Sequence, residues 1–472
     1  MNDYAKMLAF AQNFTQTNAD NTWFDKLVKW ANEHKIPHAD FPRDKEKLEN
    51  LKELCCMDCG RNYIFDALSM IFNGMKKPIP NELKAMQKPA VTSLPAEFSK
   101  LQNLEILDLS QNNFDEFPKV ILELTRLKGL HLADCHLKAL PDELANLQNL
   151  ESLNLSENKF SELPRVVCEL KKLKWLSLYG VKSLPTELAK LQELEELILG
   201  GRQINEFPSA LYELKNLRHL KILTSGLKSL PTELKSLQNL VKLNFSNTKF
   251  DEFPKVLCEL SQLKKLDLEN CGLKALPDEF ASLQSLKWLS LKNNRLTEFP
   301  KVLCELKNLE MLDLDGCALK AVPEELKNLQ KLRWLNLSGA RLNEFPSLLY
   351  ELKNLAVLDL SSCGLKALPD ELASLKNLKC LFLSYNKFGD FPQVICKLTK
   401  LERLCLSSCD LNCLPDEFAN LQNLTYLNLN DNNFAKRPSV LDKLDIDTLI
   451  LSNNDYADAF AAMARENSQK DA

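Results

Sequence analysis

The chain is poor in glycine and contains no long hydrophobic run. Only 12 of its 472 residues are glycine, so no flexible glycine-rich linker divides it. No run of about 18 apolar residues occurs, and a membrane span is therefore not expected. Residues 1–14 carry an acid at Asp3 and no basic stretch before their short apolar run, which is unlike a secretory signal. The formal net charge of −4 gives no basic surface of the kind that binds nucleic acid.

Motifs for catalysis and metal binding are also absent. The sequence contains no phosphate-binding GxxxxGK[ST] loop, no GxGxxG, no GxSxG and no HExxH. His34 and His38 lie four residues apart, but Pro37 interrupts any helix that would align them as ligands. Asp and Glu are dispersed by repeat position, and no acid–base constellation stands out. We expect no catalytic residue, no metal and no cofactor, and the chain is predicted not to be an enzyme.

A 23-residue repeat fills most of the chain. The repeat at residues 283–305 reads LQSLKWLSLKNNRLTEFPKVLCE, and the next one begins at Leu306. Counting the first leucine as position 0, leucines recur at positions 3, 6, 8 and 13, asparagine at 11, and a Phe-Pro or Leu-Pro step at 16 and 17. Fifteen repeats cover residues 101–443, and all have 23 residues except the one at 170–190, which has 21.

This pattern, LxxLxLxxNxL followed by a proline step, resembles the leucine-rich repeat of many bacterial proteins and of the Ras-group and scaffold-type repeat proteins of eukaryotes. The resemblance covers residues 41–451. It implies an α/β fold, a leucine-rich repeat solenoid curved into a horseshoe, with a parallel sheet on the concave face and helical caps at the N- and C-terminal ends. It also implies recognition of a protein or peptide partner. Relatives often attach an enzyme domain, but the residues outside the array are too few to form one.

Three segments are expected along the chain. Residues 1–40 are predicted to form an N-terminal helical cap, with helices at 3–14 and 22–34. Residues 41–451 form the solenoid, and residues 452–472 a C-terminal capping helix, at 455–466, and a tail. The repeat pattern begins at Phe41-Pro42, and the first strand pattern follows with Leu48, Leu51 and Leu54 at positions 0, 3 and 6. The Leu-Pro step of this repeat is expected at 64–65 but occurs at Leu94-Pro95, about 30 residues late, which indicates an insertion at about residues 60–89. That insertion is either an elaborated cap or a functional loop.

Within each repeat, LxxLxL predicts a short strand with leucines pointing inward and the residues between them pointing to solvent. Asparagine at position 11 can bond buried backbone groups of the turn. Cysteine fills the same position in alternate repeats and is a weaker partner. The 15 cysteines are an odd number at repeat positions, so we expect reduced thiols rather than a disulfide framework. The run CCMDC at 55–59 invites a metal interpretation, but Cys56 and Cys59 occupy the repeat positions 8 and 11.

A candidate binding site lies on the concave face, where positions 4, 5, 7, 9 and 10 point outward. Aromatic and Met side chains gather there, and charged residues flank them, as in many interface hot spots. The predicted partner-binding residues are Trp175, Trp288, Met311, Trp334, Phe382, Arg333, Asp313 and Asp359. The alternative is that the rings only fill space between neighbouring strands. Cys380 and Cys405 also point outward in adjacent repeats, which leaves a redox-sensing pair open.

The leading functional hypothesis is a non-enzymatic module for protein–protein interaction, located in the cytoplasm and acting as a monomer. An alternative is a secreted bacterial effector that acts on host proteins through the same face, with the polar residues 12–22 as an export signal. A third class, an enzyme such as a ubiquitin ligase with its own catalytic cysteine, is disfavoured because the sequence shows no domain outside the repeats.

Overall fold

The structure is a computed structural model, and it describes residues 22–36, 40–56 and 90–454. The chain folds into two compact units, residues 1–221 (the N-terminal unit) and residues 222–472 (the C-terminal unit). The helices expected at 3–14 and 455–466 and the insertion at about 60–89 lie outside the described residues, so these predictions remain predictions.

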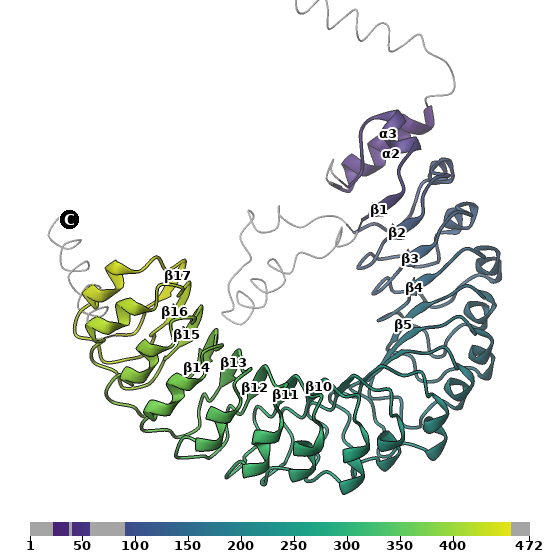
Figure 1. Ribbon diagram of the computed structural model, residues 1–472. Helices are drawn as coiled ribbons and strands as arrows, with labels where there is room; N and C mark the ends of the chain where they lie inside the picture. The colour runs from purple at the N-terminus through teal and green to yellow at the C-terminus, as the bar shows by residue number, and fades with distance from the viewer. Residues whose placement is uncertain (1–21, 37–39, 57–89, 455–472) are drawn as a thin grey trace, which may run out of the picture. The chain divides into compact units, whose positions relative to one another are not determined.

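Strands of successive repeats pair in parallel within the N-terminal unit (Figure 1). Strand β1 (Glu53–Cys55) pairs with β2 (Ile106–Asp108), and Glu53 lies opposite Ile106. Both residues occupy position 5 of their repeats, so the structure confirms the register that the sequence predicted across the intervening residues. The later strands of this unit are β3 (Gly129–His131), β4 (Ser152–Asn154), β5 (Trp175–Tyr179) and β6 (Glu196–Gly200), and β7 (His219–Leu223) contains the division between the two units.

In the C-terminal unit, strands line the inner side of a curved array and short helices line its outer side (Figure 1). Each of these strands pairs in parallel with the next one along the chain. The strands are β8 (Lys242–Asn244), β9 (Lys265–Asp267), β10 (Trp288–Ser290), β11 (Met311–Asp313), β12 (Trp334–Asn336), β13 (Val357–Asp359), β14 (Cys380–Phe382), β15 (Arg403–Cys405), β16 (Tyr426–Asn428) and β17 (Thr448–Ile450).

The return half of each repeat is a five-residue 3-10 helix that begins directly after the proline. In a typical case the N–H of Leu303 donates to the carbonyl of Pro300 at 3.0 Å. Proline suits the position before the helix for two reasons. Its ring fixes φ, and it has no backbone N–H that would need a hydrogen-bond partner there. The Pro-x-x-Leu pattern is compatible with an extended chain or with a short helix, and the structure shows the helix. In the N-terminal unit these helices are η1 (Ala96–Lys100), η2 (Lys119–Glu123), η3 (Asp142–Asn146), η4 (Arg165–Glu169), η5 (Thr186–Lys190) and η6 (Ser209–Glu213).

The C-terminal unit repeats the same arrangement at every proline step. Its 3-10 helices are η7 (Thr232–Ser236), η8 (Lys255–Glu259), η9 (Asp278–Ser282), η10 (Lys301–Glu305), η11 (Glu324–Asn328), η12 (Ser347–Glu351), η13 (Asp370–Ser374), η14 (Gln393–Lys397), η15 (Asp416–Asn420) and η16 (Ser439–Lys443).

The helix expected at residues 22–34 is present as α2 (Thr22–Glu33) and packs on the first described 3-10 helix. The Trp30 ring lies edge-on to Phe98 of η1, with 5.0 Å between centroids. Its indole N–H donates to the carbonyl of Ser93 at 3.3 Å. Leu27 of the same helix is fully buried. Helix α2 therefore shields apolar residues that would otherwise meet water, and a shorter helix, α3 (Lys45–Glu49), follows it.

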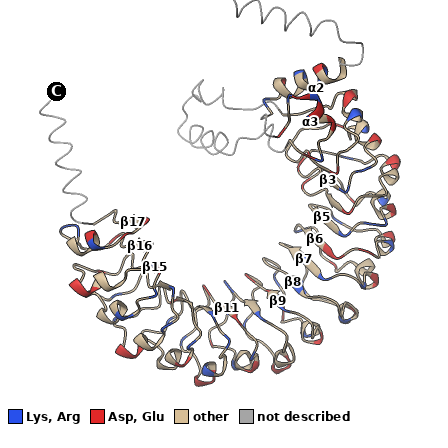
Figure 2. Ribbon diagram, turned by 45° about the horizontal axis from the view of Figure 1, so that its top comes forward, with Lys and Arg blue, Asp and Glu red and all other residues tan. Residues whose placement is uncertain are grey.

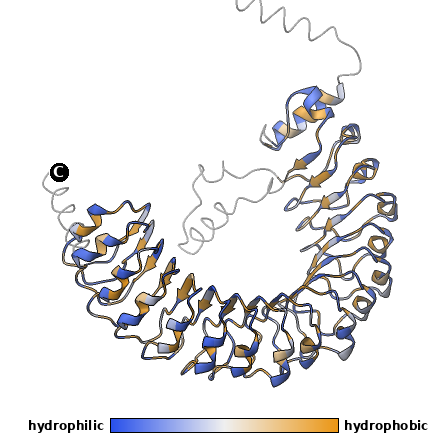
Figure 3. Cartoon of the chain, viewed as in Figure 1, coloured by the Kyte–Doolittle hydropathy of each residue, from blue (hydrophilic) through white to orange (hydrophobic). Residues whose placement is uncertain are grey.

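The core consists of the inward-facing leucines. In the repeat that contains β10, Leu283, Leu286, Leu289 and Leu291 are all 0% exposed. Figure 3 shows hydrophobic and hydrophilic residues alternating along the repeats of both units. Burying a leucine side chain stabilises the fold by about 1.5–3 kcal/mol. A single repeat cannot achieve this burial, because its leucines are covered by the repeats on either side.

Asparagine at position 11 bonds to buried backbone groups of the turn, as the sequence predicted, and four contacts are the shortest. The Asn294 amide oxygen accepts from the N–H groups of Cys271 and Leu273 at 3.1 and 3.0 Å. Its NH2 group donates to the carbonyls of Leu268 and Leu291 at 2.8 and 2.7 Å. The side chain is only 5% exposed, so these backbone groups have no access to water. Asn158 and Asn432 make the same four contacts. Asn112 and Asn386 make three of them, because each accepts from one N–H group in the described structure.

Cysteine at this position makes only one of these contacts. The Cys317 thiol donates to the carbonyl of Leu291 at 3.3 Å and offers no strong acceptor to the neighbouring N–H groups. Equivalent thiol contacts, at 3.1 to 3.2 Å, are made by Cys135, Cys271, Cys363 and Cys409.

We predict that Asn294→Ala destabilises the protein more than Cys317→Ala, although the two positions are equivalent in adjacent repeats. Removing the amide leaves two buried N–H groups and two buried carbonyls without this partner, at a cost of about 3 kcal/mol. Removing the thiol loses one weak donor, at a cost of about 1 kcal/mol. Urea unfolding followed by circular dichroism measures both variants. Equal losses would contradict the hydrogen-bonding role assigned to the asparagine.

Candidate functional site

Three predicted site residues lie side by side on the strand face of the C-terminal unit. Met311 is in register with Trp288 of the preceding strand and with Trp334 of the following one. Val357 continues the row on β13. Neighbouring strands are about 4.8 Å apart, so the four side chains form one continuous surface, which we call the aromatic strip.

Each side chain of the aromatic strip is half-buried. The ammonium group of Lys265, on β9, lies 3.8 Å from the centre of the Trp288 ring, a cation–π contact that covers part of the indole. The rings thus pack against their neighbours and still present surface to solvent. This geometry fits both open interpretations, cross-strand filling and partner binding.

A second row of outward residues runs beside the strip at position 7. Asp267, Asp313 and Asp359 occupy alternate strands of this row, with Ser290 and Asn336 between them. Each carboxylate accepts a hydrogen bond from the backbone N–H two residues later, at 2.8 to 3.1 Å. We call these three residues the acidic column.

Two residues of the acidic column carry carboxyl groups that resist ionisation. Burial raises the pKa of Asp313 to about 6, and the negative charge of Asp315 adds to this effect. Lys292 opposes it only in part, because its ammonium forms an ion pair with Asp315 at 3.2 Å. Burial likewise raises the pKa of Asp359. Neither Asp313 nor Asp359 forms an ion pair within the part of the chain that the structure describes.

The opposite edge of the strip is basic. Position 4 holds Lys264, Lys287 and Arg333 in three of the repeats concerned. Lys287 is paired with Glu310 at 2.8 Å, so this row is partly neutralised from within. Figure 2 shows acidic and basic residues interspersed along the chain. Across the strand face of these repeats, acidic residues therefore lie along one edge, at position 7, and mainly basic residues along the other, at position 4.

The remaining predicted residues divide between the two units. Phe382, on β14, is in register with Asp359 and extends the row at position 7. Trp175 belongs to the N-terminal unit, on β5, where its ring lies 5.8 Å from that of His131. Seven of the eight predicted residues thus lie in the C-terminal unit, and Trp175 does not.

One exposed aromatic residue was missed by sequence reasoning. Tyr385 is 64% exposed and lies in the turn after β14, three residues beyond Phe382. Its φ of 60° is in the left-handed region, which bulky side chains rarely adopt. The equivalent position holds Asn247, Asn270 and Asn293 in other repeats, residues that tolerate this conformation. The available signal was a tyrosine at a position where the chain otherwise uses small or polar residues.

The cysteine pair does not have the properties of a redox sensor. Cys380 is in register with Arg403, and Cys405 with Phe382, so the two thiols are diagonal rather than directly opposite. Burial raises the pKa of Cys405 to about 11 and also raises that of Cys380. The reactive thiolate is therefore scarce at neutral pH.

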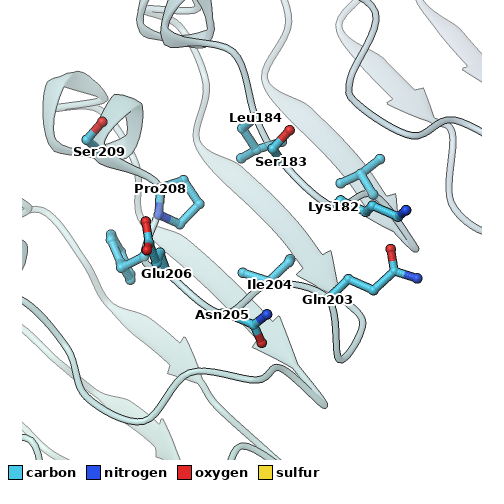
Figure 4. A pocket seen from close by; sticks show the side chains of 11 residues that line it. Lys182, Ser183, Leu184, Gln203, Ile204, Asn205, Glu206, Pro208 and Ser209 are labelled. Atoms are coloured by element: carbon cyan, nitrogen blue, oxygen red, sulfur yellow. The ribbon is translucent and has the colours of Figure 1, made fainter.

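Grooves between consecutive repeats lie beside the 3-10 helices rather than on the strand face. Figure 4 shows one of them in the N-terminal unit, between the loops that follow β5 and β6. Similar grooves occur at residues 250–277 and 343–369. Their walls combine charged side chains with apolar side chains and a proline ring, and the groove at residues 250–277 carries Asp251, Glu252, Lys255 and Lys274. The groove in Figure 4 is lined by Val181, Lys182, Ser183, Leu184, Gln203, Ile204, Asn205, Glu206, Phe207, Pro208 and Ser209.

Within the described ranges, no three His, Cys, Asp or Glu side chains come together as metal ligands. The helices in these ranges are too short or too polar to cross a bilayer.

Comparison with known families identifies the class of the protein. A family model described as "Leucine-rich repeat region" matches residues 126–228, 208–315 and 310–439. A second, "Leucine Rich Repeat", matches residues 103–124. These matches cover more than half of the chain, which therefore belongs to the leucine-rich repeat family. Modules of this family commonly serve protein–protein interaction, and their fold is typically non-enzymatic.

Solved structures agree with this assignment. A leucine-rich repeat protein of Leptospira interrogans is 33% identical, with a TM-score of 0.64, over 77% of this chain and 88% of that one. A TDR receptor is 26% identical, with a TM-score of 0.54, over 73% and 68% of the two chains. An adenylate cyclase of Schizosaccharomyces pombe is 35% identical over 92 residues. That match covers 20% of this chain and only 5% of the cyclase.

We predict that Asp313→Asn stabilises the protein at pH 8 but not at pH 4. The raised pKa means that the contribution of Asp313 to stability is complete below its unfolded-state pKa, near 4, and is lost as the pH rises through about 6. Discounted for solvent screening, the gain at pH 8 is about 1 kcal/mol. The amide can keep the bond to the N–H of Asp315, as Asn336 does with Ser338.

Urea unfolding of this variant at several pH values gives the measurement. Asp315→Asn is the control, because it loses the ion pair with Lys292 and is not expected to gain stability. A loss of stability at pH 8 for Asp313→Asn would contradict the interpretation.

We also predict that Tyr385→Asn preserves or raises the unfolding midpoint, because asparagine adopts the left-handed conformation with less strain. The gain is at most about 1 kcal/mol. Ser362→Asn, at the equivalent position of the preceding repeat, is the control for the backbone effect. A clear loss of stability in Tyr385→Asn would show instead that the exposed ring contributes to the fold.

Proposed function

We propose that this protein is a non-enzymatic recognition module that binds a protein or peptide through the strand face of its C-terminal unit. The observation that carries the proposal is the aromatic strip, in which Trp288, Met311 and Trp334 stand on consecutive strands with part of their surface exposed. Residues of these types are enriched at the energetic centres of protein interfaces.

The construction of the repeats supports such a role. The strand backbone is fixed by pairing on both sides, and Leu289, Leu312 and Leu335 anchor each strand from below. A partner therefore meets a surface that is already ordered, so little conformational entropy is lost from this side on binding. The charged edges add orientation to an apolar contact. Phe382 and Tyr385 extend the proposed surface beyond the strip.

We propose further that the protein acts as a monomer in a reducing compartment such as the cytoplasm. Thiols such as Cys135 and Cys363 donate hydrogen bonds to buried carbonyls, a role that requires them to be reduced. The alternative of an exported effector rests on residues 12–22. Of these, only residue 22 is described, so the alternative remains a prediction, and comparing secretion of the intact chain with that of a chain lacking residues 1–25 would test it.

We predict that the double variant Trp288→Ala, Trp334→Ala loses its partner while keeping its fold. Truncation of central aromatic residues typically costs more than about 2 kcal/mol of binding, so recovery in affinity capture should fall by more than tenfold. Capture with the intact chain and mass spectrometry identify the partner and quantify its recovery.

The matched control is Phe345→Ala, which truncates a half-buried aromatic residue of the same repeat as Trp334, beside η12 rather than on the strand face. This control should lose some stability and retain the partner. If the tryptophan variant retains the partner but melts at a lower temperature, the rings serve cross-strand packing and the proposal is wrong.

A further inference from the structure

We propose that the partner segment is an extended polypeptide that places arginine or lysine side chains against Asp313 and Asp359 while its apolar side chains pack on the aromatic strip. This inference rests on the proposed function and specifies the chemistry of the partner. It follows from the charge distribution across the strand face and from the spacing of the strands.

Charge complementarity favours a basic partner at one edge of the strip. In the five repeats that begin at Leu260 to Leu352, positions 7 and 9 together hold five acids and one lysine, a formal charge of −4. The lysine is Lys292, and its ammonium is already engaged by Asp315. Asp313 and Asp359 have no such partner in the described structure. A cation supplied by the partner would compensate two half-buried carboxylates that the protein itself leaves uncompensated.

Lysines at the basic edge already have acidic partners within the protein, unlike Asp313 and Asp359 at the other edge. This difference between the two edges fixes the orientation of the partner segment. Lys287 pairs with Glu310 at 2.8 Å, and farther along Lys379 pairs with Glu402 at 2.7 Å. Lys265 lies over the Trp288 ring. The partner's cations are therefore directed to the end of the strands where Asp313 and Asp359 lie, and its acidic groups away from it.

The strand spacing also specifies the sequence pattern of the partner. Asp313 and Asp359 lie two strands apart, and so do Trp288 and Trp334, which corresponds to about 10 Å. A polyproline-type extended chain rises about 3.1 Å per residue and returns to the same side every third residue, at about 9.3 Å. A segment of this form lying across the strands would present basic residues three positions apart to the two carboxylates.

A metal ion is a poorer occupant of the same place. Two strands separate the carboxylates, which is too far for both to coordinate one ion at about 2.3–2.6 Å. No third acidic, histidine or cysteine ligand joins either of them among the described residues.

A phage-displayed library of random dodecapeptides, selected on the intact chain, tests the proposal. The selected peptides should be enriched in Arg or Lys, with two basic residues three positions apart, and should carry apolar residues between or beside them. One enriched peptide that lacks histidine is then synthesised with a fluorescent label. Its dissociation constant is measured by fluorescence anisotropy on the intact chain and its variants.

The double variant Asp313→Asn, Asp359→Asn should weaken binding of this peptide by at least tenfold. Glu310→Gln is the matched control, because it removes one negative charge from the repeat that carries Asp313, directly before β11 and at the opposite edge of the strip. It should change the dissociation constant less than threefold. Replacing the peptide's basic residues with glutamine should have the same effect as the double variant, and the two changes together should be no worse than either alone.

Lowering the pH from 8 to 5 should also weaken binding to the intact chain, and much less to the double variant. The charged groups that face Asp313 are Asp315, Lys292 and Glu269, and its neighbours in the row, Ser290 and Asn336, do not titrate in this range. The pH dependence is thus assigned to the acidic column if the double variant removes it.

The outcomes separate this inference from the proposed function. Peptides that require Trp288 and Trp334 but are neutral or acidic would overturn the inference and leave the proposed function intact. If Glu310→Gln weakened peptide binding as much as the aspartate double variant does, the inference would also be overturned. The loss of negative charge anywhere on the strand face would then explain the effect. Failure to select any peptide, or selected peptides that bind the tryptophan variant normally, would overturn both.

Discussion

Each repeat buries its leucines only against the repeats beside it, and this dependence determines the role of every other position. The inward leucines, such as Leu289 between its neighbours on β9 and β11, cannot change without exposing the next repeat. The position 11 side chains satisfy the buried backbone where the strand turns. Outward residues of the strands are not needed to cover a neighbouring repeat or to bond its backbone. Their side chains can therefore vary to suit recognition.

Much of the fold could be predicted from periodicity alone. The spacing of Leu48, Leu51 and Leu54 placed β1 in register with β2 because the leucine pattern permits only one alignment. The role of Asn294 followed equally, since a buried turn needs a group that both donates and accepts. The 3-10 helices after the prolines could not be predicted from the sequence, because the Pro-x-x-Leu pattern is compatible with an extended chain as well as with a short helix.

The candidate site was only partly predictable. Repeat positions identified Trp288, Met311 and Trp334 as neighbours, because strand pairing converts equal position into proximity. They could not reveal that Asp313 is sufficiently buried to resist ionisation, since this depends on what surrounds the carboxylate in space. Tyr385, at position 10, was missed because the predicted site was chosen from positions 4, 5 and 7. The left-handed backbone and the large exposed ring of Tyr385 distinguish it only in the structure.

Hydroxyl-radical footprinting of the intact chain, with and without its captured partner, tests most directly whether the strand face is the binding surface. Trp, Met and Tyr side chains report on their own exposure, and this protein has them on both sides of the repeats. Binding of the partner should slow oxidation of Trp288, Met311, Trp334 and Tyr385 and leave oxidation of Tyr350, on η12, unchanged. Slowed oxidation of Tyr350 with no change along the aromatic strip would contradict binding through the strand face.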